Sequence, residues 1–195
     1  MKNQSYQNHQ RINGYAGLGD YAAIGDGRSV ALIAPDGAID WWCAPNMDSP
    51  PLFDRILDAS AGGFFQIAPV GDYQTERRYR ENSNVLETCF TTASGMVRVT
   101  ESLNSTFAGR LPWCELARRI ECPEGEVELQ LTFSPGTAAC TRAPWIASSR
   151  LGDVVHIGDL MAMLRTPDDM VFTLKDDKRI EGKITLREGD RTLIA

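Results

Sequence analysis

The sequence predicts an all-β protein built as one large antiparallel β-sandwich, with at most one short helix near residues 51–59. Three observations support this fold class. Short apolar runs with a period of two residues recur along the chain, as strands with one buried face require. Turn residues, mainly Gly, Pro and Asp, separate these runs, and helical periodicity is scarce. About eleven such runs are present, a number typical of a sandwich.

The composition fits a single globular domain. The chain has 195 residues, of which 43% are hydrophobic and 24% are charged, close to the averages of soluble proteins. Residues 1–10 are polar and rich in Asn and Gln. We therefore interpret residues 1–14 as a flexible polar tail and residues 15–195 as one β-sandwich domain.

Three β-hairpins are predicted in the first two thirds of the chain. In each, two alternating apolar runs flank a tripeptide that contains Gly, a residue that accepts the positive φ of tight turns. The paired runs are residues 29–34 with 38–43, 85–91 with 96–102, and 116–122 with 127–133.

Strands are expected up to the last residue. The runs of the last third are residues 154–157, 160–165, 171–175, 179–186 and 191–195. We expect the last two to pair as a hairpin across Glu188, Gly189 and Asp190. Because its second strand is still under way at Ala195, we expect a chain cut from a longer protein, before the last strands of its domain.

Residues 51–59 are the helical candidate. The apolar residues of this segment would share one face of a helix that starts after two consecutive prolines. A single short helix or a 3₁₀ turn is the expected structure.

Charge and targeting signals exclude several classes of function. The formal net charge is -6 and the Lys and Arg residues are scattered, which argues against nucleic acid as a partner. No apolar segment resembles a membrane span or a secretory signal, so we expect a cytoplasmic protein without a membrane partner. Gly17-Leu18-Gly19 has the spelling of a dinucleotide fingerprint, but no strand pattern precedes it, and we expect no cofactor.

The cysteines and histidines do not form a recognisable metal or nucleophile motif. The five cysteines are an odd number without a C-x-x-C spacing, which argues against both a disulfide framework and a zinc site. We expect most of them to be reduced, half-buried strand residues. His156 lies in an apolar run, so a strand position is favoured over a catalytic base.

A long collinear pattern resembles a known family. YAAIGDGRSVALI at 21–33 and PDGAIDWWC at 35–43 resemble the opening of trehalase-like and glucoamylase-like proteins of glycoside hydrolase family 15. PNMDSP at 45–50 and GGFFQIAP at 62–69 match the segments that follow. Shorter matches continue the pattern in order and in register: RRY at 77–79, NVLET at 84–88, VRVT at 97–100 and RRI at 118–120.

The resemblance implies a large sandwich of the supersandwich, galactose-mutarotase-like type, followed in the family by an (α/α)₆ barrel. In the family, the barrel holds two catalytic glutamates that hydrolyse an α-glucosidic bond with inversion. This chain does not include the barrel. The resemblance therefore implies that the chain holds no catalytic residue, and that its partners are its own missing barrel and, in the full-length enzyme, an α-glucoside substrate.

The candidate site is a loop region that combines carboxylates with adjacent tryptophans. Aromatic faces stack on sugars and carboxylates accept sugar hydroxyls, so Asp40, Trp41, Trp42 and Asp48 are proposed to border the substrate entrance of the whole enzyme. In the alternative, one Trp faces the core, the other packs under the loop, and the aspartates serve turns. Adjacent strand residues point to opposite faces, which favours this alternative.

These carboxylates do not have the pattern expected for catalysis. General acid chemistry needs one carboxyl whose pKa is raised by burial. The segment instead has the composition of solvated turns, so no catalytic residue is assigned.

Three functions remain in contention. The preferred hypothesis is a non-catalytic N-terminal domain that packs on and stabilises a catalytic barrel. The second is a free-standing carbohydrate-binding or protein-interaction module that uses Trp41, Trp42, Trp113 or Trp145. The third is a homodimer formed through the exposed sandwich face or an unpaired strand edge.

Overall fold

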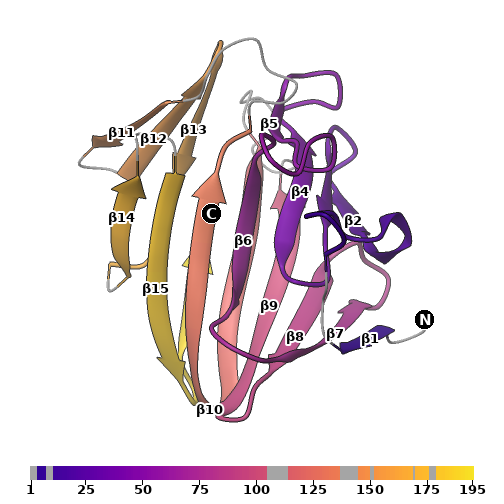
Figure 1. The fold of residues 1–195 in the computed structure, drawn as a ribbon, viewed down its shortest axis with the longest axis vertical. Helices are drawn as coiled ribbons and strands as arrows, with labels where there is room; N and C mark the ends of the chain where they lie inside the picture. The colour runs from indigo at the N-terminus through magenta and orange to yellow at the C-terminus, as the bar shows by residue number, and fades with distance from the viewer. Residues whose placement is uncertain are drawn as a thin grey trace.

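The computed structural model describes residues 4–7, 11–104, 114–136, 145–149, 152–168, 170–175 and 179–195. Within these residues, thirteen strands are hydrogen-bonded into one curled antiparallel sheet, and three more form a separate sheet (Figure 1). The predicted all-β class is confirmed. The strands are β1 Gln4–Gln7, β2 Ala22–Gly25, β3 Val30–Ile33, β4 Ala38–Cys43, β5 Pro51–Phe53, β6 Phe64–Pro69, β7 Gln74–Tyr79, β8 Leu86–Thr91, β9 Gly95–Asn104, β10 Glu115–Ser134, β11 Trp145–Ser149, β12 Gly152–Ile157, β13 Leu160–Leu164, β14 Val171–Lys175, β15 Arg179–Arg187 and β16 Arg191–Ile194.

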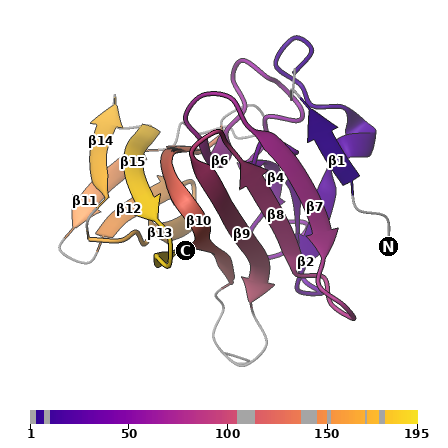
Figure 2. The same cartoon turned by 90° about the horizontal axis from the view of Figure 1, so that it is seen from below.

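The curled sheet forms the two layers of the sandwich, and β10 belongs to both. The first half of β10 pairs with β9 and β16, next to β8, β7 and β1. The second half pairs with β6 and β15, in the layer that also holds β14, β4, β3 and β2. Figure 2 shows the two layers from below. The apolar core lies between them.

The predicted hairpin at residues 116–133 is wrong, because β10 is one continuous strand of 20 residues. A β-bulge at Cys122 and Pro123 interrupts the pairing, because the register with β9 shifts between Glu121 and Glu124, and Glu124 and Gly125 then pair with β9 again. Gly125 has a positive φ, and a Cβ there would lie 2.1 Å from the main-chain oxygen of Ser94. The extra residue bends the strand so that it passes from one layer to the other.

The predicted hairpin between the last two strands is also wrong. β15 pairs with the second half of β10 and β16 with the first half, so the two neighbours lie in different layers. The turn between them is hydrogen-bonded to the bulge, because Gly189 N donates to Cys122 O and Glu188 N donates to Gly125 O. Both chain segments therefore change layers at the same point.

The other two predicted hairpins are confirmed as β3–β4 and β8–β9. The strands predicted in the last third are confirmed as β12 to β16, within one or two residues at each end. The four described cysteines are free, and two of them are only partly buried. Cys140 lies outside the described residues.

The helix expected at residues 51–59 does not form. Residues 51–53 are the strand β5, in which Phe53 pairs with Trp42, and a turn follows in which Asp54 N and Arg55 N donate to Gly63 O. Two adjacent apolar residues fit a helix face and a doubly buried strand equally well, and pairing with β4 selects the strand. In the described residues, the helical stretch is a 3₁₀ turn at Leu18–Asp20.

Two parts of the segment expected to be a tail take part in the fold. Gln4–Gln7 forms β1 and pairs with β7 at the edge of one layer. Arg11 forms ion pairs with two aspartates near the start of β4.

Side chains of β7 form hydrogen bonds with β2 and β3, and these bonds connect the two layers where β10 does not. Tyr79 of β7 donates its hydroxyl to Ala23 O and accepts from Ala23 N, which joins β7 to β2 in the other layer. Arg77, also from β7, donates to the main-chain oxygen of Ile33 in β3. The bond from Arg77 satisfies the main-chain oxygen of Ile33, a buried residue.

The three-stranded sheet lies across one end of the sandwich (Figure 1). One face of it is buried and joins the main core through Ile146, Val155, Ile157 and Leu164. The backbone of Arg165, just after β13, exchanges two hydrogen bonds with Ala195. His156 lies in β12, which confirms its predicted strand position.

None of the described segments is a helix long and apolar enough to cross a membrane.

Candidate functional site

A β-bulge in β4 sets the orientation of the candidate residues. Leu32 and Ile33 of β3 are consecutive, but they pair with Trp41 and Ile39 of β4, so Asp40 is the extra residue. The bulge breaks the two-residue alternation. Ile39 and Trp42, three positions apart, consequently both join the core.

Asp40 is fully buried and is the centre of a charge cluster. Arg11 Nη1 lies 2.7 Å from Asp40 Oδ2, and Arg55 Nη2 lies 2.6 Å from Asp40 Oδ1. The hydroxyl of Tyr21 donates to Asp40 Oδ2 at 2.6 Å. Both carboxylate oxygens are therefore engaged by donors from three separate segments.

Arg11 connects this cluster to a second carboxylate. Its Nε and Nη2 donate to the two oxygens of Asp36 at 2.7 and 2.9 Å, a bidentate arrangement. Asp36 also accepts from Ala38 N in the β3–β4 turn. The guanidinium of Arg55 lies 3.8 Å from the centre of the Phe64 ring, a cation–π contact.

The surroundings of Arg11 and Tyr21 raise the pKa of both groups, so both keep their protons. Burial raises the pKa of the Tyr21 hydroxyl, and the charge of Asp40 raises it further, so Tyr21 stays protonated as a donor. Burial lowers the pKa of Arg55, although Asp40 acts in the opposite direction. Burial also acts to lower the pKa of Arg11, but Asp36 and Asp40 outweigh it and the pKa rises. The cluster is thus an ion network centred on Asp40, both of whose carboxylate oxygens accept hydrogen bonds.

The expectation that these carboxylates lie in solvated turns is wrong for Asp36, Asp40 and Asp54, which are buried. Asp54 Oδ1 accepts from Gly63 N at 2.8 Å. Asp48 does lie exposed in a turn, as expected, and the structure does not bring it into the Asp40 cluster. The turn that carries Asp48 is bridged by Ser49 N donating to Asn46 O.

The two adjacent tryptophans have different environments. Trp42 is buried in the core, against Phe53 at a centroid distance of 6.1 Å, whereas Trp41 is half-buried. One Trp therefore faces the core, as the alternative interpretation predicted. The four residues predicted to border a substrate entrance do not form one surface.

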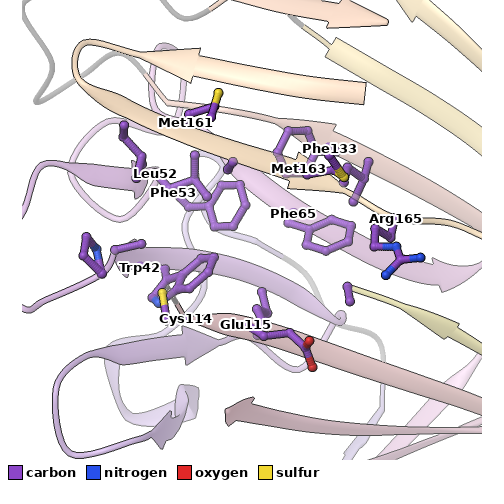
Figure 3. Close-up of a pocket in the computed structure, with 17 residues that line it drawn as sticks. Trp42, Leu52, Phe53, Phe65, Cys114, Glu115, Phe133, Met161, Met163 and Arg165 are labelled. Carbon is purple, nitrogen blue, oxygen red and sulfur yellow. The ribbon is translucent and has the colours of Figure 1, made fainter. Parts of the chain in front are cut away.

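A cavity of about 370 Å³ lies beside Trp42, at the end of the sandwich covered by β13. Four aromatic rings line it, those of Trp42, Phe53, Phe65 and Phe133, and the last two are in edge contact at 5.4 Å. Figure 3 shows the rings together with Met161 and Met163 of β13 and with Glu115 and Arg165.

The sequence patterns did not identify the partners of Asp40. Arg11 was assigned to a tail, and Arg55 lay in the segment predicted as a helix. Tyr21 was noted only as part of a family motif. Isolated polar residues have no periodicity that could reveal a contact across 15 to 29 positions of the chain. A carboxylate inside an apolar strand, such as Asp40, is the one signal that a buried partner is required.

Fold and site together define an antiparallel β-sandwich domain with a buried charge cluster and an apolar cavity at one end. The sequence profile of the trehalase-like N-terminal family matches residues 16–181. The chain belongs to this family, as the resemblance predicted.

Individual relatives are trehalases. A trehalase of Mycobacterium tuberculosis is 29% identical over 209 residues, which cover 94% of this chain and 30% of the relative. Trehalases of Thermoplasma volcanium and Thermoplasma acidophilum are 32% and 33% identical, over 64% and 59% of this chain and 20% of each relative. The chain thus spans between a fifth and a third of the length of these relatives.

Proposed function

We propose that this chain is the non-catalytic N-terminal domain of an α-glucosidic glycoside hydrolase of the trehalase or glucoamylase type, in glycoside hydrolase family 15. The observation that carries the proposal is the extent of the match. The family profile matches residues 16–181 of the chain, and the alignments with individual trehalases cover only 20–30% of the length of those proteins. In this proposal the domain packs on a catalytic barrel, stabilises it, and works in the cytoplasm on trehalose or a related α-glucoside.

The chemistry of the buried carboxylates supports a non-catalytic role. Inverting hydrolysis needs an acid and a base about 6.5–9.5 Å apart, with room for a sugar and a water between them. Asp36 and Asp40 are bound by guanidinium groups, and Glu101 is buried against Arg118. A carboxylate in such a pair has neither access to a substrate nor a free proton to give.

Of the four residues proposed to border the substrate entrance, two are accessible in the structure and two are buried. Asp40 and Trp42 are buried, so their part in it is to hold β4 and the loop that follows. Asp48 and the half-buried Trp41 remain the residues that a sugar or a catalytic domain can reach.

The first test is glucose release by the purified chain from trehalose and from maltotriose, with circular dichroism to show a folded β protein. We expect no release above the blank. Release in proportion to protein, abolished by Asp48→Asn in a sample that circular dichroism shows to be folded, would show that catalysis resides in this chain. The full product of the reading frame, assayed beside a version without residues 1–195, then tests stabilisation of the catalytic part.

A second candidate function, a carbohydrate-binding module, is favoured by one observation. The Trp145 ring is 51% exposed and stacks on His156 with 3.9 Å between ring centres and 7° between planes. An exposed, supported indole can stack on a sugar ring. Titration of the chain with malto-oligosaccharides, with Trp145→Ala as the control, tests this function. Unchanged Trp fluorescence and unchanged NMR spectra would exclude it.

A further inference from the structure

The outer face of the three-stranded sheet carries an indole, an imidazole and a thioether in one row across its strands. Trp145 of β11 is paired with His156 of β12, and His156 is paired with Met161 of β13. Directly paired residues of antiparallel strands share a face, and their Cβ atoms lie about 4.5–5.5 Å apart. Ile146 and Val155, the next pair along, are buried in the core, so this row faces outward.

A second thioether lies on the same face. Met163 follows Met161 by two positions in β13, which places both on one side of the strand. Met161 is 70% exposed and Met163 is 43% exposed, whereas Leu164 is buried. Both methionines also border the cavity beside Trp42 (Figure 3). A methionine side chain is unbranched and has three rotatable bonds, so either sulfur can turn toward His156.

The indole of Trp145 fixes the plane of the His156 imidazole. The two rings stack with 3.9 Å between centres and 7° between planes. Stacking covers a face of the imidazole and leaves its two nitrogens at the ring edge, where a metal ion binds. Within the described part of the chain, neither nitrogen is hydrogen-bonded to another residue. A ring held in this way needs little reorientation to bind a cation.

The available ligands favour a soft cation. Thioether sulfurs select Cu(I), and imidazole is also a copper ligand. Zinc instead takes thiolate, imidazole and carboxylate ligands. Among the residues that the structure describes, no group of three His, Cys, Asp or Glu side chains could hold a metal ion. Two thioethers and one imidazole therefore suit a monovalent copper-like cation better than a harder divalent one.

We propose that Met161, Met163 and His156 form a binding site for a soft monovalent cation, Cu(I) in biology and Ag(I) as its stable analogue. Trp145 is a positioning residue, because it orients the imidazole and its π-face stabilises the positive charge that the ring shares with the bound cation. The cation links β12 to β13 and should stabilise the sheet next to the cavity. This inference goes beyond the proposed function and uses none of the residues of the Asp40 cluster.

Ag(I) is the probe for the first experiment, because it needs no reductant. Thiols also bind soft cations, so accessible cysteines are first capped with N-ethylmaleimide and the fold is checked by circular dichroism. The chain carries carbon-13 in its methionine methyl groups, and NMR follows the titration. We expect the methyl resonances of Met161 and Met163 to shift together. Met47, 63% exposed in a turn outside this sheet, is the internal control and should not shift.

Matched variants separate metal ligation from packing. The double variant Met161→Leu, Met163→Leu keeps the size and apolar character of both side chains but removes their sulfurs. Loss of a residue that orients a ligand typically lowers metal affinity about 10–100-fold, and loss of the ligands should lower it at least as much. Met47→Leu should leave the affinity for Ag(I) unchanged. Trp145→Leu should lower the affinity about tenfold or more, while the methionine methyl shifts still appear at higher Ag(I).

Each outcome decides for or against the site. Methyl resonances of Met161 and Met163 that stay in place at saturating Ag(I), or that move equally with Zn²⁺, overturn it and identify the row as an apolar contact surface. A double leucine variant that binds Ag(I) as tightly as the parent chain does the same. If that variant loses its β-sheet spectrum, the methyl titration of the parent chain decides. None of these results depends on glucose release, so failure of the site and failure of the proposed function are distinguishable.

Discussion

Arg118 of β10 and Glu101 of β9 form an ion pair in the centre of the sandwich, with 2.6 Å between Arg118 Nη2 and Glu101 Oε1. The same guanidinium donates to the main-chain oxygens of Phe65 and Gly37 in the opposite layer. Burial raises the pKa of Glu101 and lowers that of Arg118, and each charge opposes this effect in the other. Arg118 thus links the two layers, and Glu101 supplies the negative charge that balances its buried guanidinium.

Removal of this pair should be among the most damaging single changes. Arg118→Met leaves Glu101 buried without its counterion and should lower the free energy of unfolding by about 3–5 kcal/mol. Arg119→Met is the matched control, because Arg119 is exposed and its pair with Glu121 is worth at most about 1 kcal/mol. Urea unfolding followed by circular dichroism measures both. Equal losses in the two variants would show that the buried pair has no special role.

The Asp40 cluster should be a stability element. Asp40→Asn removes the charge that Arg11 and Arg55 share and should cost about 2–4 kcal/mol. Asp48→Asn, on an exposed turn, should change stability by less than about 0.5 kcal/mol. Thermal and urea unfolding of the two variants provide the comparison. If Asp40→Asn is neutral, the ion network described above does not stabilise the fold.

The β10 bulge should depend on Gly125 more than the adjacent turn depends on Gly189. Both glycines have a positive φ, which costs an L-residue about 1–2 kcal/mol. A Cβ at Gly125 would also lie 2.1 Å from Ser94 O, whereas a Cβ at Gly189 meets open space. We expect Gly125→Ala to lose more than about 2 kcal/mol and Gly189→Ala about 1 kcal/mol. A larger loss at Gly189 would contradict the role of close backbone contact at the bulge.

Acid should weaken the layer formed by β7 and β8 through Glu87. Glu87 accepts from Arg78 and Arg80 at 2.8 and 2.9 Å. Burial acts to raise its pKa, but the hydrogen bonds from Arg80 and Arg78 outweigh burial and lower it. Because the folded state then binds fewer protons than the unfolded state, the contribution is complete above the ordinary glutamate pKa of about 4.3. It is lost as the pH falls through the lower pKa of Glu87.

The test for Glu87 is urea unfolding of the protein and of Glu87→Gln over a series of pH values. The variant should be less stable at neutral pH, and the difference should shrink on acidification. Two curves that remain parallel down to acid pH would show that Glu87 does not contribute.

Local patterns predicted the parts of the fold that short-range physics controls. The alternation of apolar residues identified β3, β4, β8 and β9, and glycine turns correctly joined them as two hairpins. The family was predicted from a series of short motifs in the same order and register as in the family. Any one of these motifs alone would not have identified it. One of the two adjacent tryptophans was expected to face the core in one of the two interpretations, because adjacent strand residues point to opposite faces, and the structure shows that this residue is Trp42.

The sequence by itself determined the all-β class, most strand positions and the family. It did not determine that β10 continues as one strand past Pro123, Glu124 and Gly125, because the residues that hydrogen-bond to this part of β10, Ser94 and the turn at residues 188–190, lie far away in the chain. The sequence also did not determine the partners of Asp40, because they too are distant from it in the chain. Periodicity reports which face of an element is apolar, whereas a bulge, a buried ion pair or a cavity depends on what the rest of the chain places opposite it. Those contacts are set only by the tertiary structure, because each buried charge or main-chain group must find a partner wherever the fold supplies one.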